Sequence, residues 1–208
     1  PLLKAALGAP DLVLRRLAGA RPRTPEGYEL DAQVSMLLRL MRLSGEPELT
    51  EGSVAEARAR MERSGPLLDY RDVAGIDTHD RTIPGPGSSL AARIYRPTRG
   101  SRAGLVFFHG GGFALGSIDS HDGVCRALAR DADVTVLSVN YRLAPEHPFP
   151  AAVHDAVAAT RWALDNAERL GLDPGAIAVG GDSAGGNLAA VGSQVLVDAG
   201  RRPAFQLL

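Results

Sequence analysis

The sequence predicts an α/β fold preceded by a helical segment, and three observations support this prediction. Residues 1–66 carry apolar residues at helical spacing and no strand signal. From residue 103 onwards, short apolar runs alternate with helical stretches, which is typical of parallel strands that are buried on both faces. The 208 residues are 45% hydrophobic and 23% charged, the ordinary composition of one sizeable globular domain.

The first strongly patterned helix is expected over residues 31–43. Its apolar residues fall on two faces of one helix, so the helix has to be covered on two sides or has to line an apolar site. The first face carries Val34, Leu37, Leu38 and Met41, and the second carries Met36, Leu40 and Leu43.

A further helix is expected over residues 54–63. Ser53 is the expected N-cap, and Glu56 stands three residues later, which is the spacing of a capping box. Gly65 and Pro66 are expected to end this helix.

Strand signals begin after Tyr70, where alternating residues over 78–83 and 90–96 flank a turn cluster and predict a hairpin. A mostly parallel sheet flanked by helices is expected to follow. Its strands are 104–108, 134–141, 177–179 and a fourth that starts over 205–208, and its helices are 120–131, 151–170 and 184–199. The predicted division is a helical segment over 1–70 and an incomplete α/β core over 71–208.

Composition and charge exclude several classes of protein. A net charge of −1 argues against nucleic-acid binding, which relies on clustered Lys and Arg side chains. The single cysteine, Cys125, excludes an intramolecular disulfide and a Cys-rich metal site, and we expect it in the core. Because no secretory signal and no membrane-spanning run stand out, we expect a cytoplasmic protein without a transmembrane segment, and no metal or cofactor is predicted.

The pentapeptide Gly181-Asp182-Ser183-Ala184-Gly185 matches the pattern Gly-x-Ser-x-Gly. It follows an apolar strand and opens a helix, which is the setting of a nucleophile elbow. The elbow strains the serine backbone and projects its hydroxyl above the sheet, while the glycines leave room at the turn. Ser183 is therefore the candidate nucleophile, and the alternative is a glycine-rich turn that binds an anion or packs.

A second glycine motif, His109-Gly110-Gly111-Gly112, lies directly after the strand 104–108. Glycines let the main chain approach a ligand closely and present N–H groups to it. The amides of Gly111 and Gly112, with that of Ala184, are candidates for an oxyanion hole that would stabilise a tetrahedral intermediate. His109 is expected to support this loop rather than to transfer protons, and the alternative is a flexible turn.

These motifs together resemble the hormone-sensitive-lipase-like family of α/β-hydrolase esterases. The similarity covers the chain from about residue 29 to its last residue and is strongest at 109–112, 141–152 and 180–187. The resemblance implies an α/β-hydrolase fold, an N-terminal helical cap over the acyl pocket, and a small-molecule ester as substrate. The middle block is expected to be structural, with Arg142 and Glu146 as a possible ion pair.

A serine nucleophile needs a general base that a carboxylate orients. In α/β-hydrolases the chain order is Ser, then Asp or Glu, then His. Here all five histidines precede Ser183, and Asp198 is the only acidic residue after the elbow. The acid, the base and the C-terminal strands and helices of the fold are therefore expected to be missing from this chain, which would be nearly inert alone.

The sequence leaves three functions open. The first is a serine ester hydrolase that acts through an acyl-enzyme on uncharged esters of short to medium acyl chains. The second is a non-hydrolytic small-molecule receptor on the same scaffold, and the third is an inactive fragment. Homo-oligomers are possible in each case.

Overall fold

The computed structural model describes residues 7–19, 21–45, 47–48, 50–68 and 73–208. Within the predicted helical segment 1–70, residues 1–6, 20, 46, 49, 69 and 70 lie outside this description. The chain divides into two compact units, Pro1–Ser53 and Val54–Leu208, and each is described by itself.

The N-terminal unit is built on two helices, α2 (Asp11–Ala18) and α3 (Ala32–Ser44). The side chain of Asp31 caps α3 by accepting hydrogen bonds from the backbone N–H groups of Gln33 (2.8 Å) and Val34 (3.2 Å). The two helices bury a small core between them, formed by Leu14, Ala18, Ala32 and Met36.

The two predicted apolar faces of α3 differ in the structure. Met36 of the second face is buried against α2, and Leu40 packs beside it. The first face is largely open within this unit, because Val34, Leu38 and Met41 are 42%, 38% and 56% exposed. The sequence therefore predicts the helix correctly, but α2 covers only the Met36 and Leu40 part of the second face, because Leu43 is 73% exposed.

The second unit begins with helix α4 (Val54–Leu68), directly after Ser53 as predicted. The prediction that Gly65 and Pro66 end this helix is wrong, since α4 continues to Leu68. Gly65 serves close packing instead: a Cβ at this position would lie 3.2 Å from the carbonyl oxygen of Ser120. The predicted helical segment 1–70 includes α4, whereas in the structure α4 packs with the unit that contains the sheet.

One six-stranded sheet organises the second unit, with strand order β1-β2-β4-β3-β5-β6. Strands β4, β3, β5 and β6 run parallel, and the hairpin β1–β2 joins β4 antiparallel. The strand bounds are β1 (Ile76–Pro84), β2 (Ser89–Pro97), β3 (Gly104–Phe108), β4 (Thr135–Val139), β5 (Ile177–Gly181) and β6 (Gln206–Leu207). The predicted hairpin and mostly parallel sheet are confirmed.

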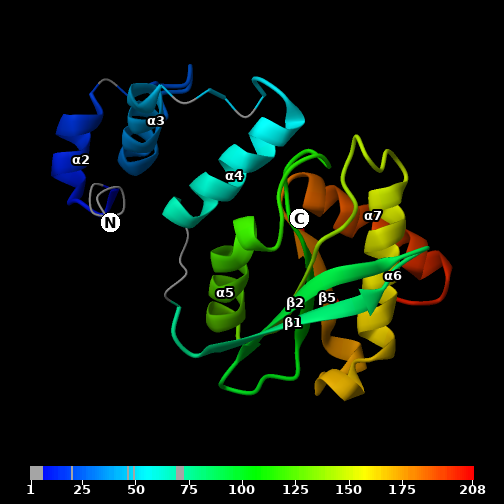
Figure 1. Cartoon of the computed structure of the whole chain (residues 1–208). Coiled ribbons are helices and arrows are strands. Elements are labelled where there is room, and N and C mark those ends of the chain that lie inside the picture. The colour runs from blue at the N-terminus through cyan, green and yellow to red at the C-terminus, as the bar shows by residue number, and fades with distance from the viewer. Residues whose placement is uncertain (1–6, 20, 46, 49, 69–72) are drawn as a thin grey trace. The chain divides into compact units, whose positions relative to one another are not determined.

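Helices cover both faces of this sheet: α5 lies on one face and α6 and α7 lie on the other (Figure 1). Alternation along β3 explains the two layers, because Leu105 and Phe107 pack with α5 while Val106 and Phe108 pack with α6 and α7. The helix bounds are η1 (Asp119–His121), α5 (Asp122–Asp131), α6 (Ala151–Asp165), η2 (Glu168–Leu170), η3 (Pro174–Ala176) and α7 (Ala184–Asp198).

Two predicted elements are shorter than expected. The helix predicted over 151–170 ends at Asp165, and its predicted last residues form a turn and the short 3-10 helix η2 instead. The strand predicted over 134–141 pairs only from Thr135 to Val139. Cys125 of α5 is fully buried against the sheet, as predicted. Among the residues described above, none of the helices is long and apolar enough to cross a membrane.

Candidate functional site

The predicted motifs meet at the carboxyl edge of three neighbouring parallel strands. In the sheet register Phe108, the last residue of β3, is opposite both Gly181 of β5 and Val139 of β4. The loops that leave these strands are the glycine motif 109–112, the elbow 182–183 and the segment 140–150. The parallel register therefore brings together stretches that are far apart in the sequence.

Ser183 occupies the tight turn between β5 and α7. Its backbone lies in a strained region (φ 54°, ψ −115°), and its side chain is exposed. The turn fits against β3 because Gly181 and Gly185 lack side chains; a Cβ at either position would overlap the carbonyl oxygen of Phe108. Within the described part of the chain, no side chain or backbone group forms a hydrogen bond with the Ser183 hydroxyl.

The glycine motif forms a compact loop with left-handed backbone at three successive residues: Gly111 (φ 120°), Gly112 (φ 60°) and Phe113 (φ 62°). The Gly111 carbonyl accepts hydrogen bonds from the backbone N–H groups of Ala114 (3.1 Å) and Leu115 (2.8 Å), which close the loop. The N–H groups of Gly111, Gly112 and Ala184 donate to no acceptor among the residues that the structure describes. They are thus free to donate to a ligand.

Asp182 links the elbow to the glycine motif. Its Oδ1 atom accepts a hydrogen bond from the Gly110 N–H at 2.9 Å and lies 3.3 Å from Nε2 of His121. Burial raises the pKa of Asp182, but the His121 ring and the Gly110 N–H outweigh that effect and hold the pKa below its ordinary value. Asp182 is therefore a carboxylate that orients the loop on which the candidate oxyanion donors stand.

His109 is buried at the base of the glycine motif, with 1% of its surface exposed. Its Nδ1 lies 2.9 Å from the Gly110 carbonyl oxygen, and its ring stacks on Tyr141 at a centroid distance of 4.4 Å. Burial lowers the pKa of His109 to about 4, so the ring is neutral near pH 7. The Tyr141 hydroxyl donates to the His109 carbonyl at 2.7 Å. The contacts attach His109 to the base of the loop, and its supporting role stays a prediction.

The predicted pairing of Arg142 with Glu146 is wrong. Arg142 instead holds Asp155, which is fully buried in α6, through its side chain (2.7 Å from Nη2 to Oδ1) and its backbone N–H (2.8 Å). A buried carboxylate needs such a partner, because unpaired burial of its charge is costly. Glu146 pairs with Arg58 of α4, 88 residues earlier in the chain.

Among the residues that the structure describes, none of the five histidines forms a hydrogen bond with Ser183. His79 lies on β1, His154 is exposed on α6, His147 lies in the proline-rich segment, and His109 and His121 lie beneath the glycine motif. Over the described ranges, no group of three His, Cys, Asp or Glu side chains could hold a metal ion.

The contacts of Arg58, His121 and Tyr141 around the glycine motif were not predicted from the sequence. Each acts across a long separation in sequence: the His121 ring reaches Asp182, and the Tyr141 hydroxyl reaches His109. No local pattern marks such contacts. The one available signal was the position of Tyr141 at the end of the apolar run 134–141, which places it at the same edge of the sheet as the glycine motif.

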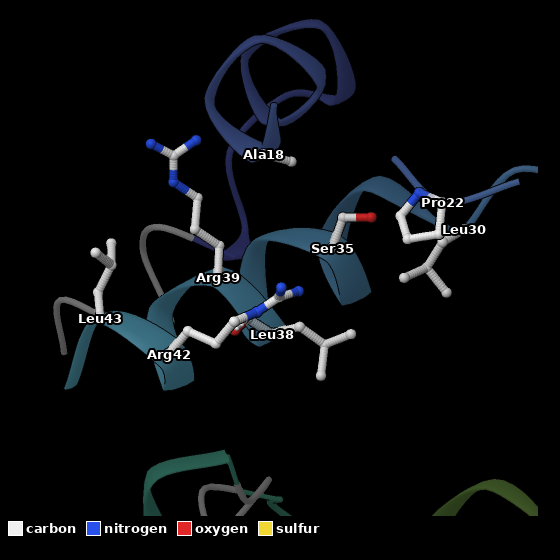
Figure 2. A pocket seen from close by; sticks show the side chains of 8 residues that line it. All are labelled: Ala18, Pro22, Leu30, Ser35, Leu38, Arg39, Arg42 and Leu43. Atoms are coloured by element: carbon white, nitrogen blue, oxygen red, sulfur yellow. Dashed lines mark hydrogen bonds between the residues drawn. The ribbon is translucent and has the colours of Figure 1, made fainter. Parts of the chain in front are cut away.

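The N-terminal unit has a groove of its own, with a volume of about 230 Å³. Figure 2 shows Ser35, Leu38, Arg39 and Arg42 of α3 among the residues around it. The Arg39 guanidinium donates to the Leu17 carbonyl at 2.8 Å, so this side chain ties α3 to α2. The groove contains none of the residues predicted to carry chemistry.

The sheet order, the strained serine turn and the glycine loop before it together define an α/β hydrolase. A family model described as an alpha/beta hydrolase fold matches residues 105–208, half of the chain. The chain belongs to the hormone-sensitive-lipase-like family of α/β-hydrolase esterases.

Curated relatives and solved structures agree with this assignment. Carboxylic ester hydrolase LipN of Mycobacterium tuberculosis is 44% identical over 190 residues, which are 90% of this chain and 50% of that protein. Ethyl acetate hydrolase of Pseudomonas putida is 42% identical over 65% of this chain and 44% of its own length. The esterase of the archaeon Pyrobaculum calidifontis superposes with a TM-score of 0.77 at 41% identity, covering 89% of this chain and 57% of that one. The chain spans about half the length of the curated relatives it matches.

Proposed function

We propose that the protein is a serine carboxylic-ester hydrolase that works through an acyl-enzyme. The observation that supports this most strongly is the strained, exposed Ser183 at the edge of the sheet where the glycine motif also begins. In this proposal the Ser183 hydroxyl attacks the ester carbonyl carbon and its proton passes to a general base. The carbonyl oxygen becomes negatively charged in the tetrahedral intermediate.

The amides of Gly111, Gly112 and Ala184 are proposed to stabilise that oxyanion. Each of these donors is worth about 2.7–4 kcal/mol in the transition state of comparable enzymes. Collapse of the intermediate breaks the bond to the alkoxy oxygen, which takes the proton from the general base and leaves as the alcohol, while the acyl group stays on Ser183. Attack of water on the acyl-enzyme, through a second tetrahedral intermediate, then releases the acid and regenerates the hydroxyl.

We propose that the general base and its orienting carboxylate come from outside these 208 residues. Three findings support this: no histidine lies at Ser183, His109 is neutral and engaged beneath the loop, and the relatives are about twice as long. His121 faces Asp182, whose Oδ1 already accepts the Gly110 N–H, and so serves the loop in this proposal.

The proposed substrates are uncharged esters with short to medium acyl chains. The name of the Pseudomonas putida relative, ethyl acetate hydrolase, supports the short end of this range. The cap role of the N-terminal helices stays a prediction. Replacing exposed Leu38 and Met41 of α3 by serine tests it, because a cap residue would change the preference for acyl-chain length.

Hydrolysis of p-nitrophenyl acetate, butyrate and octanoate by the full-length protein tests the proposed activity. We expect turnover that Ser183→Ala abolishes, and labelling of Ser183 by a fluorophosphonate, located by mass spectrometry. The 208-residue chain is expected to be at least 10³-fold slower, since loss of a triad histidine costs on the order of 10⁶ in a comparable enzyme. Normal turnover by the 208-residue chain would contradict the proposed origin of the base.

The same preparation separates the remaining alternatives. Saturable binding of an ester without turnover would indicate the receptor, and absence of cooperative thermal unfolding would indicate an inactive fragment. Size-exclusion chromatography tests whether homo-oligomers form, and cell fractionation tests the cytoplasmic location that the sequence predicts.

A further inference from the structure

We infer that Arg58 of α4 is a positioning residue that holds the glycine motif in the geometry needed for the oxyanion. This inference rests on the proposed function and assigns to it a side chain that lies 53 or more residues before the proposed donors. Nothing in the Gly-x-Ser-x-Gly or His-Gly-Gly-Gly patterns indicates such a residue.

Four hydrogen bonds fix the Arg58 guanidinium. Its Nε donates to the Ala114 carbonyl at 2.8 Å, and Nη2 donates to the Ala144 carbonyl at 2.8 Å. Nη1 and Nη2 also grip the Glu146 carboxylate at 2.8 and 2.7 Å. Arginine offers five N–H donors in a planar fork, so one side chain ties two loops to α4 with a fixed geometry.

The two loops that Arg58 holds are also joined to each other. The Ala144 N–H donates to the carbonyl of Phe113 at 2.9 Å, and Phe113 directly follows Gly112. Phe113 itself has a positive φ, a strained conformation for a side chain of its size. Contacts with the surrounding residues have to hold Phe113 in this conformation. Arg58 reinforces the hydrogen bond between Ala144 and Phe113, because it also donates to the carbonyls of Ala144 and of Ala114, the residue after Phe113.

One face of α4 supports the glycine motif and the residues after it. Arg58 contacts Ala114, Glu62 accepts a hydrogen bond from the Ser117 hydroxyl at 2.6 Å, and Gly65 packs on the Ser120 backbone. The positions 58, 62 and 65 follow helical spacing, so a single stripe of the helix makes all three contacts. The contact made by Arg58 is the nearest of the three to the proposed donors, because Ala114 is two residues beyond Gly112.

The charges around the clamp favour this arrangement. The hydrogen bond from Arg58 lowers the pKa of Glu146 to about 2, so the carboxylate is ionised throughout the pH range in which an esterase works. Glu146 in turn raises the pKa of Arg58. The interaction is therefore present whenever the proposed reaction proceeds.

Steady-state kinetics of Arg58→Met in the full-length protein tests the inference, with Arg63→Met as the matched control. Arg63 is exposed on the same helix, so its replacement removes the same charge without touching the glycine motif. We expect kcat of Arg58→Met to fall about 10- to 100-fold with little change in KM, because displaced donors weaken only the transition state. Arg58→Lys keeps the charge but loses the planar fork of donors, so its kcat should lie between those of Arg58→Met and Arg63→Met.

Amide hydrogen exchange of the peptide that covers residues 110–116 gives a readout that does not depend on turnover. We expect faster exchange in Arg58→Met than in Arg63→Met, at a temperature where both are folded. Should Arg58→Met fail to fold, Glu146→Gln and Arg58→Lys provide the same comparison with smaller changes.

The inference is overturned if Arg58→Met melts at a lower temperature but keeps both the kcat and the 110–116 exchange rate of Arg63→Met. The proposed function fails separately, if the wild-type protein shows no turnover that depends on Ser183. In that case unchanged exchange at 110–116 would still overturn the positioning role, and faster exchange would still support it.

Discussion

The backbone N–H of Gly110 donates to Oδ1 of Asp182 at 2.9 Å, across 72 residues of the chain. This hydrogen bond joins the residue before the candidate nucleophile to the residue before Gly111, the first candidate oxyanion donor of the glycine motif. The Asp182 carboxylate therefore helps to fix the position of Gly111 and Gly112 relative to Ser183. The same oxygen lies 3.3 Å from the His121 ring, which orients it further.

We predict that Asp182→Ala lowers kcat of the full-length enzyme about 10- to 100-fold, because a small misplacement of catalytic groups is costly. Asp182→Asn keeps an acceptor for the Gly110 N–H and should retain more activity than alanine. Asp198→Ala, an exposed carboxylate at the end of α7, serves as the control. Ester-hydrolysis kinetics measure the effect, and wild-type kcat in Asp182→Ala would refute it.

The strained backbone of Ser183 predicts that glycine at this position stabilises the fold while it removes the proposed nucleophile. Ser183→Gly should raise the free energy of unfolding by about 1 kcal/mol, because relief of about 1–3 kcal/mol of strain exceeds the added entropy of the unfolded glycine. Ser183→Ala keeps the Cβ atom and should remain near the wild type. Thermal denaturation compares the two inactive variants, and a glycine variant no more stable than the alanine variant would count against stored strain.

Close packing at the elbow predicts that Gly185→Ala is severely destabilising. The new Cβ would overlap the Phe108 carbonyl, so β3 and α7 would have to separate, at an expected cost of more than about 3 kcal/mol. Gly87→Ala in the hairpin loop is the control, since it has positive φ but open space around it. Its cost should be about 1–2 kcal/mol of backbone strain. Urea denaturation of both variants decides the comparison.

The buried, neutral His109 predicts a loss of stability in mild acid. Its pKa is about 4 in the folded chain and near 6.5 when the chain unfolds, so between these values only the unfolded state binds the proton. The free energy of unfolding is unaffected by this ionisation above about pH 6.5, and it falls by about 3 kcal/mol as the pH drops to about 4.

His109→Phe removes this ionisation and retains a ring that can stack on Tyr141. We expect the stability of the wild type relative to His109→Phe to decrease steadily from pH 7 to pH 4. Urea titrations at several pH values measure this difference. A difference that stays constant with pH would show that His109 is not held neutral.

Local sequence patterns were sufficient for the sheet and for the elbow. The apolar runs that became β3 and β5, and the glycines around Ser183, each carry their signal within a few residues. The parallel register then brings the two motifs together without further information, because strands of one sheet end at a common edge.

The contacts that the sequence did not reveal are long-range side-chain contacts. Arg142 stands four residues from Glu146, but its partner is Asp155, and Glu146 bonds Arg58, 88 residues away. Charge and spacing alone allow either pairing, and only the buried position of Asp155 selects the observed one. The prediction that Gly65 ends a helix failed for a similar reason, because a glycine in a helix can mark either the end of the helix or a close contact.

The division of the chain before Val54 bears on how this family can be recombined. A chimaera that takes a foreign N-terminal segment up to residue 70 would replace Arg58, Glu62 and Gly65 together with the helices in front of them. A junction placed between Ser53 and Val54 would exchange α2 and α3 while the native Arg58–Glu146 pair stays intact. An exchange of the N-terminal helices that tests their predicted cap role should therefore place its junction after residue 53.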